Sequence, residues 1–287
     1  MTSPALDIDA LRGWIGRTHV AHDIVSPRRA REMMATLDIE QGSVSAGDLA
    51  PLAIHWCLAP PAAATATLGP DGHPPRGDFL PPVPLPRRMW ASGALRFHDR
   101  LRIGDAVERR SRIADVVAKS GRGGDLCFVT LDHEILTARG PAIAEQQTIV
   151  YRAAEPVVAP PPIVPVPLAR RGADAGRHRD LLASTAMLFR YSALTFNAHR
   201  IHYDRDYARD VEGYPGLVVQ GPLLATQLLE FAAADRGAAP TQFSFRALGP
   251  VFDNIPYRLR ACDDADRLTL WIETGDGQRM TEAEAGW

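Results

Sequence analysis

The longest apolar segment of the chain predicts one buried helix. Residues 222–234 (PLLATQLLEFAAA) place hydrophobic side chains on most faces of a helix, and glycines stand on either side at Gly221 and Gly237. A helix that is apolar on most faces must be covered by other elements. We therefore expect a helix that starts after Gly221, ends before Gly237 and is wrapped by a curved sheet.

Alternating apolar and polar positions predict an antiparallel meander in each half of the chain. The first meander begins at Leu95 and includes strands over 106–117 and 126–136, and the second begins at Phe245 and includes strands over 257–261 and 267–273. Residues 275–287 alternate too weakly to be assigned to a strand or to a tail.

Two segments carry the same signal for the start of a helix. Ser26 precedes Pro27, Asp204 precedes Arg205, and an Ala-Arg pair follows each cap at the same offset. Serine and aspartate are favoured N-caps, and proline is favoured at the first helical position. Each half thus combines helical segments with a following antiparallel meander, which predicts an α+β fold.

Proline-rich segments suggest how the chain is divided. Six prolines fall between positions 156 and 167, where they oppose both helix and central strand. We interpret residues 156–168 as an extended linker between an N-terminal domain, 1–155, and a C-terminal domain, 169–287. A second proline-rich segment, 70–86, is expected to be a long loop within the first domain.

Composition excludes several classes of protein. The 287 residues are 46% hydrophobic and 23% charged, which is typical of a globular chain with a sizeable core. The formal net charge of −2 gives no basic excess for phosphates, so a nucleic-acid partner is excluded. No apolar run approaches the roughly 20 residues of a membrane helix, so a membrane role is excluded as well.

Three further features bear on the source and location of the protein. The cysteines, Cys57, Cys127 and Cys262, are odd in number and far apart, which fits neither a disulfide framework nor a zinc cluster. The first residues show no secretory signal, so we expect a cytoplasmic protein. Lys119 is the only lysine among 32 basic residues, which suggests a GC-rich bacterial gene.

The segment from Tyr191 to Gly221 carries the candidate chemistry. Asn197 and His202 lie five residues apart in a predicted loop, and a glycine-rich run then leads to the start of the apolar helix. The first turn of a helix presents unpaired N–H groups and a partial positive charge. We expect the Gly221 N–H to polarise a carbonyl oxygen while His202 moves a proton nearby.

This segment resembles the MaoC-like hydratases and dehydratases of acyl thioesters, whose signature is roughly D-x-N-P-x-H followed by a glycine-rich stretch ending in H-G. On that register His202 matches the catalytic histidine, Asn197 the catalytic aspartate and Gly221 the glycine that holds the thioester oxygen. The sequence departs from the signature at Asn197, at His199-Arg200 and at Gln220, which replaces the histidine before the glycine.

Two longer motifs narrow the resemblance. TFNAHRIHYD, residues 195–204, is similar to the double hot-dog dehydratases that include the mitochondrial 3-hydroxyacyl-thioester dehydratase and bacterial mesaconyl- or itaconyl-CoA hydratases. Residues 69–93, GPDGHPPRGDFLPPVPLPRRMWASG, look like the insertion of that bacterial subgroup. The resemblance covers about residues 14–260 and implies a double hot-dog, in which two antiparallel sheets each wrap around a helix.

The resemblance also implies an activity, the reversible addition of water across the α,β double bond of an enoyl thioester. His202 would activate the water, Asn197 would orient it and the Gly221 N–H would hold the enolate oxygen. No metal or redox cofactor is implied, because coenzyme A enters as part of the substrate. The first half lacks matching Asn and His residues, so we expect one active site per chain and a degenerate first half that shapes the acyl pocket.

Several roles have alternatives. Asp204 could assist proton transfer, although a helix cap is the favoured interpretation. His199-x-x-His202-x-Asp204 resembles a metal site, but no further ligands accompany it, so we expect none. Among candidate substrate contacts, Arg87 and Arg88 could bind a substrate carboxylate or be solvated loop charges, and Gln220 and Tyr191 could face the acyl group, with packing as the alternative for Tyr191.

The favoured function is hydration of a small, branched dicarboxylic enoyl-CoA of the mesaconyl or itaconyl type. A dehydratase of 3-hydroxyacyl chains on acyl carrier protein or coenzyme A is the alternative within the class. A non-catalytic acyl-thioester binding protein is the alternative from another class. Acyl length, direction, stereochemistry and the choice between a monomer and a homodimer are left open.

Overall fold

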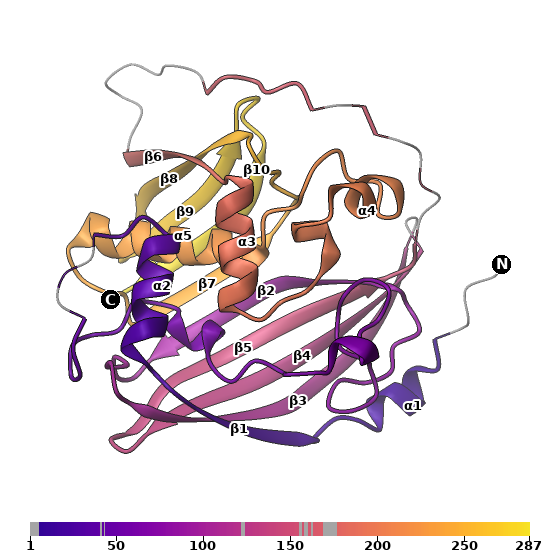
Figure 1. Ribbon diagram of the computed structural model, residues 1–287, viewed down its shortest axis with the longest axis horizontal. Helices are drawn as coiled ribbons and strands as arrows, with labels where there is room; N and C mark the ends of the chain where they lie inside the picture. The colour runs from indigo at the N-terminus through magenta and orange to yellow at the C-terminus, as the bar shows by residue number, and fades with distance from the viewer. Residues whose placement is uncertain are drawn as a thin grey trace.

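The computed structural model describes residues 6–40, 42, 44–121, 124–154, 157, 160–161, 163–168 and 177–287. Ten strands form one antiparallel sheet in the order β1-β3-β4-β5-β2-β7-β10-β9-β8-β6 (Figure 1). The strands are β1 (Thr18–Ile24), β2 (Arg87–Phe97), β3 (Ala106–Gly121), β4 (Gly124–Thr137), β5 (Gly140–Arg152), β6 (Arg177–Leu182), β7 (Gln242–Ala247), β8 (Pro256–Asp264), β9 (Arg267–Thr274) and β10 (Arg279–Gly286).

The two halves of the chain meet where β2 pairs with β7, so their strands form one continuous sheet rather than two separate ones. At this seam Gly93 lies opposite Phe245. A Cβ on Gly93 would lie 2.5 Å from the Phe245 ring, so the glycine lets the ring lie over the strand. The ring packs with Trp56 and Trp90, at centroid distances of 6.0 and 5.9 Å.

The predicted strands over 106–117, 126–136, 257–261 and 267–273 are confirmed as parts of β3, β4, β8 and β9. Strands β1, β5 and β6 were not predicted, and β10 is found where the pattern was too weak. Residues 279–286 form β10, which lies between β7 and β9 in the sheet. Its inward positions are Thr281, Ala283 and Ala285. These small side chains are buried, but they give little hydrophobic contrast in the sequence.

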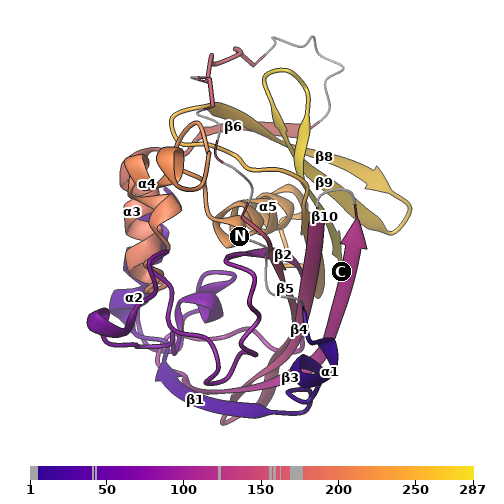
Figure 2. The same cartoon turned by 90° about the vertical axis from the view of Figure 1, so that its right-hand side faces the viewer.

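The apolar helix is also confirmed, as α5 (Gly221–Arg236). Figures 1 and 2 show it on the concave side of the second-half strands, and it contacts β7, β8, β9, β10 and β2. Leu223, Leu228 and Leu229 on it are fully buried. Gly237 follows with φ of +66°, a left-handed conformation that favours glycine and ends the helix.

The first half holds no comparable helix in the part of the chain that the structure describes. Its longest is α2 (Pro27–Thr36), which packs beside α3 (Thr185–Leu194) of the second half; α1 (Ile8–Arg12) is shorter. A 3₁₀ turn, η1 (Ile54–Cys57), contributes buried side chains to the same core as α5. Another turn is η2 (Thr65–Thr67). A loop segment thus takes the place of a buried helix.

Both predicted N-caps are present. The Ser26 hydroxyl accepts from the Arg29 N–H at 3.1 Å at the start of α2. The Asp204 carboxylate accepts from the Tyr207 N–H at 3.0 Å at the start of α4 (Arg205–Asp210). These bonds satisfy donors that a first helical turn leaves unpaired.

The proline-rich loop 70–86 is built into the first half. Val83 and Leu85 are 1% exposed and join a core cluster with Tyr151. The Arg76 guanidinium donates to the carbonyls of Val83 and Leu85 at 2.6 and 2.5 Å. Buried side chains and these bonds fix the loop to the sheet.

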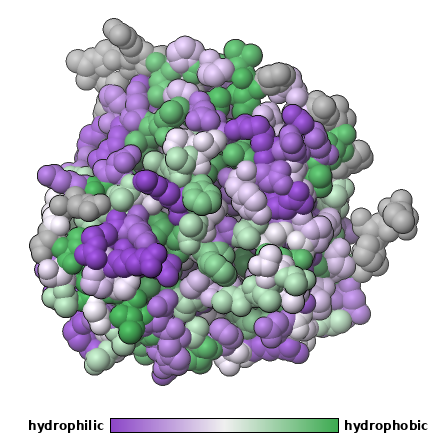
Figure 3. Space-filling view, in the orientation of Figure 1, coloured by the Kyte–Doolittle hydropathy of each residue, from purple (hydrophilic) through white to green (hydrophobic). Residues whose placement is uncertain are grey.

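The proposed domain boundaries stay a prediction. Described residues between 157 and 168 lie in no helix or strand, whereas residues 155–156, 158–159, 162 and 169–176 lie outside the described part. No helix among the described residues is long and apolar enough to cross a membrane. On the face seen in Figure 3, hydrophilic and hydrophobic residues are interspersed.

The burial of α5 generates a stability prediction. We expect Leu228→Ala to lower the free energy of unfolding by about 2–5 kcal/mol, because burial is lost and a cavity is left. Leu182→Ala is the matched control, since Leu182 is 47% exposed, and it should change the same quantity by about 0.5 kcal/mol or less. Urea unfolding followed by tryptophan fluorescence measures both. Equal losses would contradict the placement of α5.

Candidate active site

His202 is buried and held in one tautomer. It ends η3 (Arg200–His202), is 7% exposed, and its Nδ1 lies 2.7 Å from the Val218 carbonyl oxygen. Because that oxygen can only accept, Nδ1 carries the proton and Nε2 keeps its lone pair. Burial lowers the pKa of His202 to about 4. His202 is therefore a neutral base at neutral pH.

Gly221 begins α5 a few residues beyond Val218, the hydrogen-bond partner of His202. Pro222 at the second position has no N–H, and the first N–H groups of a helix have no acceptor within it. A Cβ on Gly221 would lie 3.7 Å from the Trp90 carbonyl oxygen, which is ordinary contact. The helix terminus thus offers the Gly221 N–H and a partial positive charge three residues after Val218, the residue that holds His202.

Gln220 and Tyr191 lie behind this helix start. The Gln220 side chain is fully buried, and its amide nitrogen donates to the Leu188 carbonyl at 2.9 Å and to the Ser192 hydroxyl at 3.0 Å. These bonds tie α5 to α3. Tyr191 on α3 is 1% exposed and belongs to the core. The geometry thus gives both residues structural contacts, and substrate contact stays a prediction.

Asn197 is joined to His199 by a hydrogen bond. Its side-chain oxygen accepts from the backbone N–H of His199 at 3.0 Å. The backbone N–H of Asn197 donates to the Ser192 carbonyl at 2.8 Å. The amide oxygen thus already accepts one hydrogen bond, and the NH₂ group is the donor that Asn197 can offer to a water molecule.

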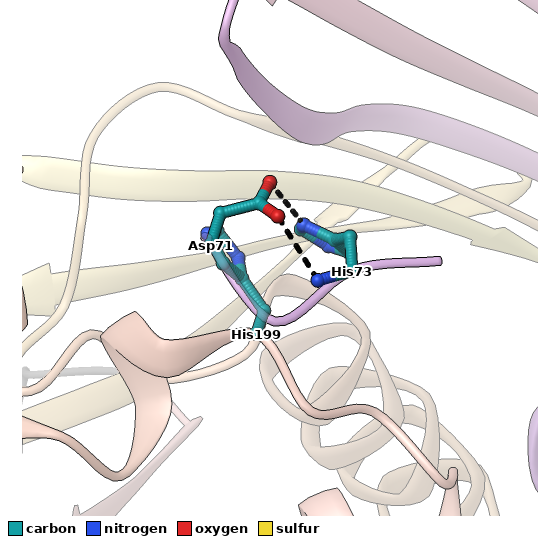
Figure 4. Close-up of side chains that lie close together, drawn as sticks. All are labelled: Asp71, His73 and His199. Carbon is teal, nitrogen blue, oxygen red and sulfur yellow. Dashed lines mark hydrogen bonds and ion pairs between the residues drawn. The ribbon is translucent and has the colours of Figure 1, made fainter. Parts of the chain in front are cut away.

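A group that the sequence interpretation missed lies beside His202. The His199 ring meets the His202 ring edge-on, with centroids 5.4 Å apart and an angle of 88°. On its other side the His73 ring lies 4.1 Å from His199. The Asp71 carboxylate is 2.8 Å from His73 Nδ1 and also accepts from the His73 backbone N–H, as Figure 4 shows. We call Asp71, His73, His199 and His202 the histidine column.

The first two members of the column come from the proline-rich loop, which docks on the catalytic segment. The Arg200 N–H donates to the Asp71 carbonyl at 2.9 Å. Gly72 has φ of +85°, and a Cβ there would lie 1.9 Å from the Ala198 carbonyl oxygen. Only glycine permits this approach. Asp71-Gly72-His73 is visible in the sequence as a turn, but no spacing rule connects it to residues 197–202.

Both oxygens of Asp204 have structural partners. One oxygen caps α4 and the other pairs with the Arg200 guanidinium at 2.7 Å. The favoured interpretation as a helix cap is confirmed.

Arg87 and Arg88 start β2 but have different surroundings. Arg87 is 9% exposed and pairs with Glu212 at 3.0 Å. Arg88 is half-buried, has no ion pair within the described residues, and is close enough to His73 and His199 for its charge to lower the pKa of both. Burial lowers the pKa of Arg88 itself. Arg88 is thus the cation beside the histidine column.

Asp71, His73 and His199 also have the ligand types of a metal site. Their candidate ligand atoms lie within 4.8 Å of one another. His73 Nδ1, however, is hydrogen-bonded to Asp71, and the His73 and His199 rings are tilted by 37° to one another. A metal bound by both His73 Nδ1 and Asp71 would have to replace that bond. The set differs from the His199-x-x-His202-x-Asp204 pattern considered above.

Comparison with known proteins identifies the family of the chain. Residues 53–253 match the family described as hydroxyacyl-thioester dehydratase type 2. The chain is 44% identical over 271 residues to the mesaconyl-C(4)-CoA hydratase of Chloroflexus aurantiacus, covering 94% of this chain and 95% of that protein. It is 30% identical over 217 residues to the mitochondrial hydroxyacyl-thioester dehydratase type 2 of Schizosaccharomyces pombe, covering 67% and 69%.

Solved structures bear on the fold. HtdX of Mycobacterium tuberculosis has a TM-score of 0.64 at 17% identity, covering 94% of this chain and 99% of that one. Another protein of the same organism, described as having a double hot-dog fold, has a TM-score of 0.58 at 14% identity, covering 94% and 95%. The predicted double hot-dog is confirmed. The chain belongs to the hydroxyacyl-thioester dehydratase type 2 family and is a hydro-lyase.

Proposed function

We propose that this protein hydrates a short, branched enoyl-CoA that carries a second carboxylate, of the mesaconyl or itaconyl type. The observation that carries the proposal is the neutral, buried His202, whose Val218 partner lies just before the α5 terminus. The named activity of the Chloroflexus relative supports the substrate class.

In this reaction His202 Nε2 takes a proton from water while the water oxygen bonds to Cβ of the enoyl group. The π electrons move towards the thioester oxygen, and the Gly221 N–H stabilises the enolate. The Asn197 NH₂ group orients the water. His202 then returns the proton to Cα, so the protein ends unchanged. No step needs a metal or redox cofactor.

Arg88 is the proposed anchor for the second carboxylate. Arg87 is already neutralised by Glu212, whereas Arg88 forms no ion pair within 4 Å among the described residues, and its neighbours are the Asp71 charge and the Tyr151 hydroxyl. A half-buried guanidinium binds a carboxylate by charge-assisted hydrogen bonds. Crotonyl-CoA lacks this carboxylate and separates the proposed substrate class from a fatty-acyl dehydratase. A homodimer and a cytoplasmic location stay predictions.

Turnover of candidate substrates tests the proposed reaction directly. Wild-type protein should consume mesaconyl-CoA or itaconyl-CoA, measured as loss of enoyl-thioester absorbance, and His202→Gln should lower kcat by about 10²–10⁴-fold because the base is removed. His22→Gln is the matched control, since the His22 side chain is 70% exposed on β1. Turnover of crotonyl-CoA alone would favour the 3-hydroxyacyl dehydratase. Binding without turnover would favour an acyl-thioester binding protein.

The pH dependence of kcat/KM reports the protonation of His202. Because burial lowers the pKa of His202 to about 4 and the neutral imidazole is the active form, kcat/KM should fall only as the pH drops through about 4. An ordinary histidine would lose activity near about 6.5. Tryptophan fluorescence at each pH verifies that the protein is folded. An acid limb near the ordinary value would contradict a buried base.

The proposed role of Arg88 is tested by comparing KM for substrates with and without a second carboxylate. Arg88→Gln should raise KM for the dicarboxylic substrate by about 10–100-fold, the usual range for a hydrogen bond to a charged group, and leave KM for crotonyl-CoA unchanged. Arg96→Gln, at an exposed position of the same strand, is the matched control. Steady-state kinetics with both substrates measures the difference. An equal change for both substrates would rule out Arg88 as the carboxylate anchor.

A further inference from the structure

The active site lacks a carboxylate where the family resemblance places one. Asn197 stands at that position, and its side-chain oxygen is occupied by the His199 N–H. Both oxygens of Asp204 are committed to Tyr207 and Arg200. The carboxylate that contacts the histidine rings is that of Asp71, which comes from the first half of the chain.

We propose that Asp71, acting through His73 and His199, is a positioning residue that stabilises the positive charge on His202 during turnover. This inference rests on the proposed hydration reaction. The proton leaves water for His202 Nε2 and later bonds to Cα, so the column gains one positive charge and then loses it. Asp71 compensates that charge without accepting the proton.

The four side chains contact one another in the order Asp71, His73, His199, His202. Asp71 holds His73 through both the ring Nδ1 and the backbone N–H, at 2.8 and 3.0 Å. His73 stacks on His199, and His199 meets His202 edge-on. The Gly72–Ala198 approach and the Arg200–Asp71 hydrogen bond fix the loop in this position. The column is therefore an ordered unit that joins the two halves.

The charges of the column suit this role. Hydrogen bonds from His73 keep the pKa of Asp71 well below its usual range, so Asp71 is ionised. Burial lowers the pKa of both His73 and His199, so neither cancels that charge at neutral pH. Arg88 and Arg76 are cations close to His73, Arg88 is also close to His199, and a protonated His73 lowers the pKa of His202. A substrate carboxylate on Arg88 would neutralise it and leave the charge of Asp71 available to His202.

The hydrogen bonding and charge of the cluster argue against a metal there. Asp71 already accepts from both the ring Nδ1 and the backbone N–H of His73. Arg88 adds a positive charge beside the cluster, which disfavours a cation there. The charge of Asp71 is therefore placed to act on His202 rather than on a bound metal.

The test is Asp71→Asn, which keeps an acceptor for His73 but removes the charge. We expect kcat to fall about 10–100-fold, because the positive charge on His202 is less stabilised in the transition state. KM should be nearly unchanged. The acid limb of kcat/KM should move to lower pH, because a lost negative charge makes the nearby imidazoles harder to protonate. His73→Gln should lower kcat similarly, and His22→Gln should change neither quantity.

Gly72→Ala separates charge from loop docking. Its Cβ would clash with the Ala198 carbonyl, so it should raise KM and lower kcat together. If Asp71→Asn behaves like Gly72→Ala, without a shift of the acid limb, or like His22→Gln, the inference is wrong. Loss of wild-type activity with EDTA and recovery with Zn²⁺ would overturn it in favour of a metal site.

One readout does not depend on turnover. Histidine ring signals followed by NMR through an acid titration should move to lower pH in Asp71→Asn than in wild type and His22→Gln. Identical titrations would overturn the role of Asp71 whatever the substrate. Shifted titrations with no hydration of any enoyl-CoA would instead show that the proposed function fails while the electrostatic coupling stands.

Discussion

The structure depends on the burial of α5 against the second-half strands. Leu223, Leu228 and Leu229 are fully buried, and the helix cannot move along its axis without exposing them. This fixes the position of the first turn, including the Gly221 N–H. The segment that leads into the helix supplies the Val218 carbonyl, which sets the tautomer of His202. Hydrophobic burial of α5 thus fixes a polarising N–H group, and the Val218 hydrogen bond ties the neutral base His202 to the segment that leads into it.

The two halves make unequal contributions to the site. The second half supplies α5, His202 and Asn197. The first half has a loop where a long buried helix would lie, and it extends residues 70–86 towards the catalytic segment. The contact between Gly72 and Ala198 is so close that a side chain would prevent it. The first half therefore contributes Asp71, His73 and Arg88 rather than a second buried helix.

The sequence predicted what depends on local patterns. The ends of α5 follow from its flanking glycines, and the caps at Ser26 and Asp204 follow from short-range hydrogen bonding. The family signature identified His202, Asn197 and Gly221 as candidates. β10 was missed because alanine and threonine fill its buried positions. The Asp71–His73 pair was missed because its partners are distant in sequence, and the different fates of Arg87 and Arg88 depend on where Glu212 lies.

The central claim is that the thioester carbonyl binds at the start of α5 beside His202. Isotope-edited infrared spectroscopy tests it directly, with mesaconyl-CoA carrying ¹³C at the thioester carbonyl and bound to His202→Gln, which cannot turn it over. The C=O stretch of the bound substrate should lie at lower frequency than that of the free substrate in water, because the Gly221 N–H polarises the bond. A stretch at the same or a higher frequency would contradict it.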